Sequence, residues 1–147
     1  WGNFMNREVF GEYTDNFLAM RLPIEAVRSR DISGNVAAHI VEGTNYIQVH
    51  PTFLYESLWN LMILILMLVY RKYKKFDGEI CLLYFGSYGL GRFWIEGIRT
   101  DTLFIPGTSL AVSQVLSLCM VIFAVVTDIV VRMHLKKQPK VEKIKNF

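Results

Sequence analysis

Four side chains that can do chemistry share one face of a helix in the segment GEICLLYFGSYGLGRFWIEGIRTD: Tyr88, Arg92, Glu96 and Arg99. At 100° per residue these positions fall within roughly 80° of one another. The apolar residues on the other side of this helix are expected to face lipid: Leu83, Leu90, Phe93 and Trp94. Because a planar guanidinium can bind two phosphate oxygens at once, two arginines in one stripe favour an anionic, phosphate-bearing ligand.

The same stripe has a structural interpretation, which stays open at this point. An arginine inside an apolar helix costs several kcal/mol unless it is paired or hydrated. Glu96 lies four residues after Arg92 and can pair with it. Such an ion pair would lock helices together without any reaction. Glycines at 86, 89, 91 and 97 would let neighbouring helices approach closely.

A second group of reactive side chains lies in the segment HPTFLYE, which contains His50, Tyr55 and Glu56. The spacing brings these three to one membrane surface, where they can meet the Arg92 stripe. Glu56 is also electrostatically favourable near a helix N-terminus, whatever its function. Taken alone, His50 is better explained as an interfacial histidine than as a catalyst.

The segment GNFMNREVFG, with Asn3, Asn6, Glu8 and Gly11, is weak evidence by itself, because asparagine and glycine gather in ordinary turns. Asp128 and Arg132, also four residues apart, are interpreted as an edge pair with no chemical role. Cys81 and Cys119 lie in apolar stretches and are expected to be buried small hydrophobic residues, not a disulfide or a metal pair.

The apolar residues that position these motifs are concentrated in long stretches. Hydrophobic residues make up 52% of the chain, and Leu61 to Tyr70 contains no charge. We expect three membrane helices over about 52–70, 79–96 and 109–131. The first would rise about 28 Å, close to the thickness of one hydrocarbon core. Residues 1–50 are polar and rich in turns, which predicts a small head outside the bilayer with some strand structure.

Two basic segments orient these helices. The block RKYKK at 71–75 follows the first apolar run, and the tail 132–147 is also basic. Basic loops favour the cytoplasm, so both segments are predicted there. Residues 1–50 and the loop 99–109 then lie on the outer side. Two helices separate the two basic segments, as this arrangement requires.

Together, the three motifs resemble the prolipoprotein diacylglyceryl transferase family. GNFMNREVFG matches its signature Gly-Arg-x-Gly-Asn-Phe-x-Asn-x-Glu-x-x-Gly, apart from a Gly-Arg that would precede Trp1. HPTFLYE is similar to His-Pro-x-x-Leu-Tyr-Glu, and YGLGRFWIEGIRTD is similar to Tyr-Gly-x-x-Arg-Phe-x-x-Glu-x-x-Arg-x-Asp. The resemblance covers about residues 1–131, in order and spacing. Since the chain begins at Trp1, we expect it to be the C-terminal half of a longer enzyme.

The resemblance implies an all-α, multi-pass protein of the bacterial cytoplasmic membrane, with about seven spans, an outward head and a cytoplasmic C-terminus. It implies transfer of a diacylglyceryl group from phosphatidylglycerol to the lipobox cysteine of a prolipoprotein. Arg92, Glu96 and Tyr88 are the expected catalytic residues. The expected substrate-binding residues are Asn3, Asn6, Glu8, Gly11, His50, Tyr55, Glu56 and Arg99. The proton acceptor would be His50 or a histidine in the missing N-terminal half.

No metal, cofactor or nucleic acid is expected as a partner; the expected partners are the two substrates, the bilayer and the missing N-terminal half. The main alternative is a non-enzymatic membrane subunit, for example half of a transporter, in which the Arg92–Glu96 pair only locks helices. The two functions differ in their substrates. The enzyme needs phosphatidylglycerol and a cysteine-bearing peptide, whereas the structural subunit needs neither.

Overall fold

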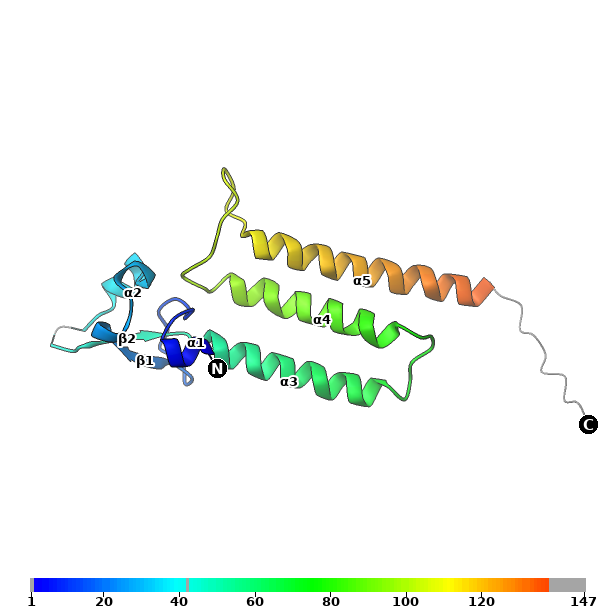
Figure 1. The fold of residues 1–147 in the computed structure, drawn as a ribbon, viewed down its shortest axis with the longest axis horizontal. Helices are drawn as coiled ribbons and strands as arrows, with labels where there is room; N and C mark the ends of the chain where they lie inside the picture. The colour runs from blue at the N-terminus through cyan, green and yellow to red at the C-terminus, as the bar shows by residue number, and fades with distance from the viewer. Residues whose placement is uncertain (1, 42, 138–147) are drawn as a thin grey trace, which may run out of the picture.

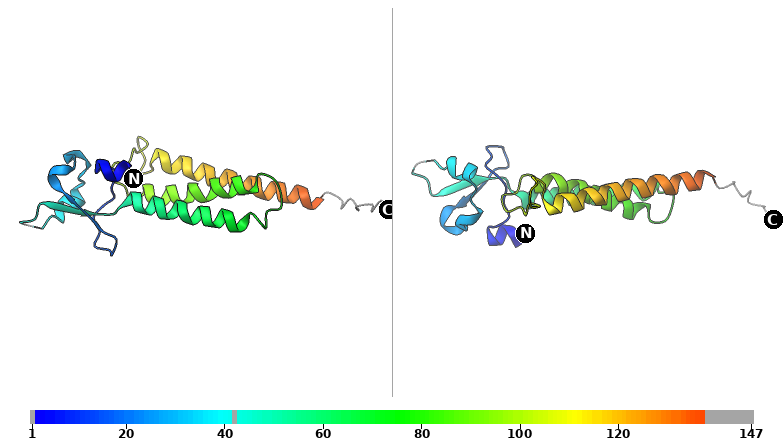
Figure 2. Two further views of the ribbon diagram at one scale, coloured as in Figure 1. Left: turned by 60° about the horizontal axis from the view of Figure 1, so that its bottom comes forward. Right: turned by 90° about the horizontal axis from the view of Figure 1, so that it is seen from above.

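The computed structural model describes residues 2–41 and 43–137. Three long helices, α3 (Thr52–Tyr70), α4 (Glu79–Glu96) and α5 (Val112–Lys137), run side by side with α4 in the middle (Figure 1). Seen from above, they overlap, so they form a single layer, and a small head lies at one end of it (Figure 2). Most of the basic tail expected at 132–147 lies outside the described residues.

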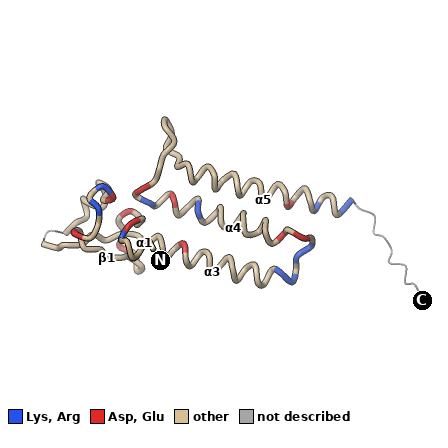
Figure 3. Tube along the Cα trace, viewed as in Figure 1, with Lys and Arg blue, Asp and Glu red and all other residues tan. Residues whose placement is uncertain are grey.

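The first two long helices occupy the ranges expected from the sequence. The third begins at Val112 instead of 109 and continues to Lys137, beyond the expected end at 131. By length and composition, α3 and α5 are apolar enough to cross a membrane, and α4 is not among the helices in the described ranges that meet this criterion. The charges of the three helices gather near their ends, while much of α3 and α5 carries none (Figure 3). Membrane crossing by all three helices stays a prediction.

The head contains two strands, two 3₁₀ turns and two short helices. In chain order these are α1 (Gly2–Asn6), β1 (Met20–Pro23), η1 (Ile24–Ala26), η2 (Ser29–Asp31), α2 (Gly34–Ala38) and β2 (Tyr46–Val49). β1 and β2 pair antiparallel, with Met20 opposite Val49 and Pro23 opposite Tyr46. The expected all-α class therefore describes the helical layer but not the head, whose strands the turn-rich sequence did suggest.

The head has a hydrophobic core of its own. Its buried members are Phe10, Leu22, Val27, Val36, Ile47 and Val49. Along β2, Ile47 and Val49 are buried while Tyr46 and Gln48 are partly exposed, the alternation of a strand with one face on a core. α2 begins at a capping serine, because the Ser33 side chain accepts a hydrogen bond from the Val36 amide. This core fixes the residues around position 50 at the end of the helical layer.

Glycines set how closely α4 approaches its neighbours. A Cβ on Gly89 would lie 2.8 Å from the Ser117 carbonyl oxygen of α5, which is too close for any real side chain. On the other side of α4, a Cβ on Gly91 would overlap the Trp59 ring of α3. The expectation that glycines allow close packing is confirmed at these two positions.

Candidate active site

The three sequence motifs meet where the head joins the helices. The Gly11 amide donates to the His50 carbonyl at 3.0 Å, and the Glu12 amide donates to the Ile98 carbonyl at 2.9 Å. A Cβ on Gly11 would lie 2.7 Å from that Ile98 oxygen and 2.8 Å from the His50 Cβ. The segment around Gly11 thus fits between the residues that precede α3 and those that follow α4, and only glycine fits there. Gly11 is therefore a packing residue of the junction.

A chain of ion pairs runs from α3 across α4 into the following loop. Arg92 Nη1 lies 2.5 Å from Glu56 Oε1 on α3, and its Nη2 lies 3.3 Å from Glu96 Oε2. Arg99 continues the chain, at 3.2 Å from Glu96 and 3.0 Å from Asp101. The pairing of Arg92 with Glu96 was expected, but Glu56 is the closer partner. Two arginines therefore face three carboxylates at one site.

The residues of this ion-pair chain differ in how deeply they are buried. Glu96 is 5% exposed, whereas the side chains of Arg92 and Glu56 are 30% and 29% exposed. Burial lowers the pKa of the Arg99 guanidinium, but its hydrogen bond to Asp101 and the charges of Asp101 and Glu96 outweigh this effect and raise that pKa overall. Arg99 thus stays charged and contacts the same oxygen of Glu96 as Arg92 does, while the more exposed Arg92 side chain remains open to a ligand.

A small pocket of about 40 Å³ lies beside Arg92. Tyr88 lines it, as the helical stripe predicted, and stacks on Tyr84 with ring centroids 5.7 Å apart. The pocket residues are Glu56, Trp59, Asn60, Tyr88, Gly91, Arg92 and Ile95. Trp59 and Asn60 were not identified from the sequence. Their positions three and four residues after Glu56 were the available signal, because such residues share a helix face with it.

His50, Tyr55 and Asn16 form a second polar group at the start of α3. His50 Nδ1 lies 2.9 Å from the Tyr55 hydroxyl, to which the Asn16 amide donates at 3.1 Å. The Asn16 amide nitrogen is also 3.5 Å from His50 Nδ1. This arrangement fits a neutral ring whose Nδ1 accepts a hydrogen bond from the Tyr55 hydroxyl. The expected meeting of His50 and Tyr55 is present, while Asn16 was missed because it lies in a loop of the head.

Burial lowers the pKa of His50 below its ordinary value. The folded state therefore binds this proton less readily than the unfolded chain, so the stability contributed by the neutral ring is present above about pH 6.5 and lost as the pH falls through the folded-state pKa. We expect acidification below pH 6 to loosen this group, because a protonated Nδ1 would point a second donor at Tyr55 and Asn16. Thermal unfolding between pH 5 and 8 would measure this effect. His50→Asn, which cannot titrate, should flatten the dependence; an unchanged slope would contradict the assignment.

The contacts of Asn3, Asn6 and Glu8 in the N-terminal motif are with one another and with Arg28. Asn6 donates to Glu8 at 3.0 Å, and Glu8 lies 3.7 Å from Arg28. The Asn3 carbonyl accepts from the Glu8 amide at 3.0 Å. In the described residues, no contact joins Asn3, Asn6 or Glu8 to Arg92. Their role in holding a ligand stays a prediction.

Comparison with known proteins decides the family. The family model described as prolipoprotein diacylglyceryl transferase matches residues 1–130. The chain belongs to the prolipoprotein diacylglyceryl transferase family. It is 46% identical to the phosphatidylglycerol–prolipoprotein diacylglyceryl transferase of Prochlorococcus marinus (strain MIT 9215), over 73% of this chain and 34% of that protein.

Two further relatives with the same name are matched over more of the chain. The Clostridioides difficile (strain 630) protein is 36% identical over 95% of this chain and 45% of its own length. The Bacillus cereus (strain G9842) protein is 40% identical over 90% of this chain and 44% of its own length. The chain thus spans about a third to under half of these relatives. No solved structure gives a significant match.

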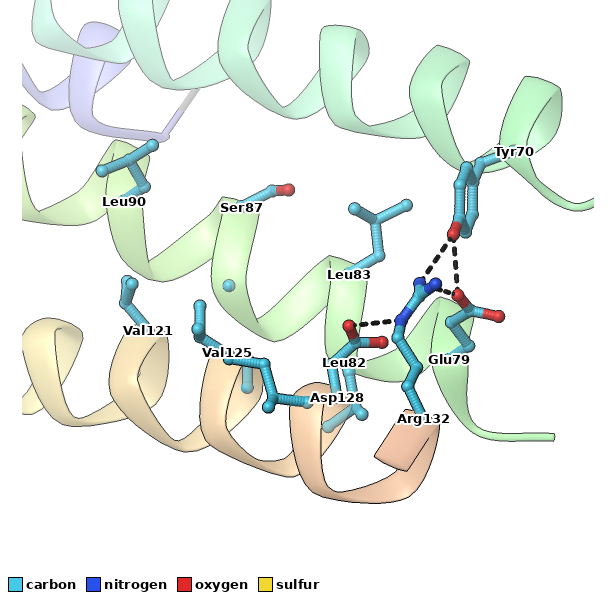
Figure 4. A pocket seen from close by; sticks show the side chains of 13 residues that line it. Tyr70, Glu79, Leu82, Leu83, Ser87, Leu90, Val121, Val125, Asp128 and Arg132 are labelled. Carbon is cyan, nitrogen blue, oxygen red and sulfur yellow. Dashed lines mark hydrogen bonds and ion pairs between the residues drawn. The ribbon is translucent and has the colours of Figure 1, made fainter. Parts of the chain in front are cut away.

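Another polar group of this transferase-family chain lies at the far end of the helical layer. Arg132 pairs with Asp128 at 2.6 Å and also with Glu79, while the Tyr70 hydroxyl donates to Glu79 at 2.7 Å (Figure 4). The Lys75 amide donates to Glu79 as well. The interpretation of Asp128 and Arg132 as a local edge pair was incomplete, because Arg132 links α5 to both other helices. We call Tyr70, Glu79, Asp128 and Arg132 the far cluster.

An apolar groove of about 370 Å³ ends at the far cluster. Leu83 and Leu90 line it, and Leu90 is exposed on the helix, so the expectation that they face lipid stays a prediction. The ring of Trp94 lies 6.1 Å from that of Tyr55 and 6.3 Å from that of Trp59, but the residue is still exposed, so its facing lipid also stays a prediction. Cys81 and Cys119 are exposed on the helices, so the expectation of burial was wrong. None of the residues expected to be catalytic or substrate-binding lines the groove, so it is not the candidate active site.

Proposed function

We propose that the protein containing this chain transfers the diacylglyceryl group of phosphatidylglycerol to the lipobox cysteine of a prolipoprotein. The cysteine thiolate attacks the carbon of the diacylglyceryl group that bears the phosphate. A carbon–sulfur bond forms there, and the bond from this carbon to the phosphate oxygen breaks. Glycerol 1-phosphate leaves, and the thiol proton passes to a base. Membership of the family supports this reaction over a non-enzymatic membrane subunit.

The observation that carries the proposal is the arginine held between two carboxylates beside a pocket. Arg92 contacts Glu56 and Glu96 and still has an exposed portion at the pocket. A guanidinium fixed in this way can stabilise the charge that builds on the departing phosphate without moving during the reaction. In the proposed site, Tyr88 donates to the phosphate or the glycerol, and Glu96 orients Arg92. His50 is one candidate for the base; the missing N-terminal half can supply another.

The proposed orientation places the head and the 99–109 loop outside the cytoplasmic membrane, with the loop 71–75 and the C-terminus inside. The exposed basic residues 71, 72, 74 and 75 between α3 and α4 support it. The site formed by Arg92, Glu56 and Glu96, which we call the Arg92 site, then lies near the outer surface, where a secreted prolipoprotein arrives. A cysteine placed at position 73 should resist a membrane-impermeant thiol reagent in intact cells and react after permeabilisation. Strong labelling in intact cells would reverse the orientation.

Substrate choice tests the proposed function directly. With the full-length protein, transfer to a lipobox peptide should proceed from phosphatidylglycerol and poorly from phosphatidylethanolamine, since the arginines favour a net-anionic headgroup. Radiolabelled lipid transfer measures both rates. A lipobox peptide with serine in place of cysteine is the matched control and should accept no lipid. Equal rates from the two lipids would show that the arginines do not select the headgroup.

A further inference from the structure

The Trp59 ring of α3 occupies the space that Gly91 leaves open on α4. A Cβ on Gly91 would lie 2.0 Å from Trp59 Nε1 and 2.2 Å from its Cδ1. The ring is also tied in place, because Nε1 donates to the Ser87 carbonyl at 2.9 Å. Trp59 therefore cannot turn aside without losing a hydrogen bond within the layer. We call this arrangement the Trp59–Gly91 contact.

This contact lies next to the Arg92 site on both helices. Trp59 follows Glu56 by about one turn of α3, and Gly91 directly precedes Arg92. Glu56 and Arg92 form the 2.5 Å ion pair that joins the same two helices. The distance and axial alignment of α3 and α4 at this level therefore determine whether Glu56 can reach Arg92.

We infer that Trp59 is a positioning residue, which acts through Gly91 to hold Glu56 against Arg92 and so aims the guanidinium at the pocket. The effect of Trp59 on the transfer rate rests on the proposed function, whereas its effect on the contact between Glu56 and Arg92 does not. A larger residue at 91 pushes the helices apart at the site, and Arg92 then follows Glu96 alone. A shift of about 1 Å in a group of this kind costs roughly 10²-fold in rate.

The test compares two glycine substitutions in the same helix. Gly91→Ala disturbs the Trp59–Gly91 contact, while Gly89→Ala is the matched control, because its Cβ meets α5 at Ser117 and not α3. A double-mutant cycle of Glu56→Gln and Arg92→Met is measured by thermal unfolding in the original protein and again in each glycine variant. The cycle gives the coupling energy between Glu56 and Arg92 in each of these three proteins. We expect coupling in the original protein and with Gly89→Ala, and its loss with Gly91→Ala.

A rescue variant and an activity measurement complete the test. Trp59→Leu, which is smaller and can turn away, should restore part of the coupling when it is combined with Gly91→Ala. In the full-length protein, Gly91→Ala should lower kcat roughly 10²-fold with little change in KM. Coupling that persists with Gly91→Ala overturns the inference, whatever the activity. If Gly91→Ala abolishes the coupling but the original protein transfers no lipid, the positioning role of Trp59 is supported and the proposed function is refuted.

Discussion

Arg92→Lys is expected to lower diacylglyceryl transfer roughly 10²–10³-fold, the usual loss on removing one preorganised stabilising group. Lysine keeps the charge but not the planar fork. Arg92 uses one terminal nitrogen for Glu56 and the other for Glu96. A lysine has a single terminal nitrogen and cannot occupy both positions at once, so the planar donor set presented to a phosphate is lost. Radiolabelled lipid transfer to a lipobox peptide, beside a thermal-aggregation curve, separates this loss from misfolding.

The control for this prediction follows from the pairing across the helices. Arg92→Met with Glu56→Gln removes one positive and one negative charge, so the net charge of the ion-pair chain is unchanged. The pairs between Glu96, Arg99 and Asp101 stay intact. Replacing Arg92 and Glu96 instead would leave Glu56 without this partner and remove one partner of Arg99. The double variant should insert and fold but transfer no lipid, because an intact ion pair can often be replaced as a unit. Near-normal transfer by a well-folded double variant would leave Arg92 and Glu56 as a structural lock.

The sequence predicted those parts of the site that depend on one helix. The stripe of Tyr88, Arg92 and Glu96 follows from helical periodicity, and the bounds of α3 and α4 follow from apolar runs bordered by charge and glycine. The closer partner of Arg92 did not follow, because Glu56 reaches it only through the relative alignment of two helices. The two helices meet there at Trp59 and Gly91. The sequence marked Gly91 as a position of close approach but gave no sign that Trp59 fills it.

The loop and far-end contacts were missed for a related reason. Asn16 meets His50 and Tyr55 through the fold of the head, which polar, turn-rich sequence does not define. The sequence analysis did not single out Glu79, because acidic residues are common at helix starts. An antiparallel order of the three helices brings the end of α3, the start of α4 and the end of α5 together. The charges at these ends were therefore a usable signal for the far cluster.

Arg132→Met is expected to lower the free energy of unfolding clearly more than a surface substitution does, because it removes the cationic partner of a buried carboxylate. Glu79 is 2% exposed and would keep its charge without its cationic partner. Tyr70 and the Lys75 amide would still donate to it, which limits the loss. Thermal unfolding in detergent measures the change. Arg71→Met, at an exposed arginine beside Tyr70, is the matched control and should change stability by less than about 0.5 kcal/mol.

Restoring the charge balance tests whether the far cluster is purely structural. Arg132→Met combined with Glu79→Gln removes the buried carboxylate together with its cationic partner and should recover most of the lost stability, because only the partly exposed Asp128 is then left without Arg132. Thirteen residues of α4 separate Glu79 from Arg92, a rise of about 20 Å. Transfer per folded molecule should therefore be the same in the single variant, the double variant and the original protein. A folded double variant with strongly reduced transfer would show that the far cluster acts on the Arg92 site through α4, and the two ends of the layer would then be coupled.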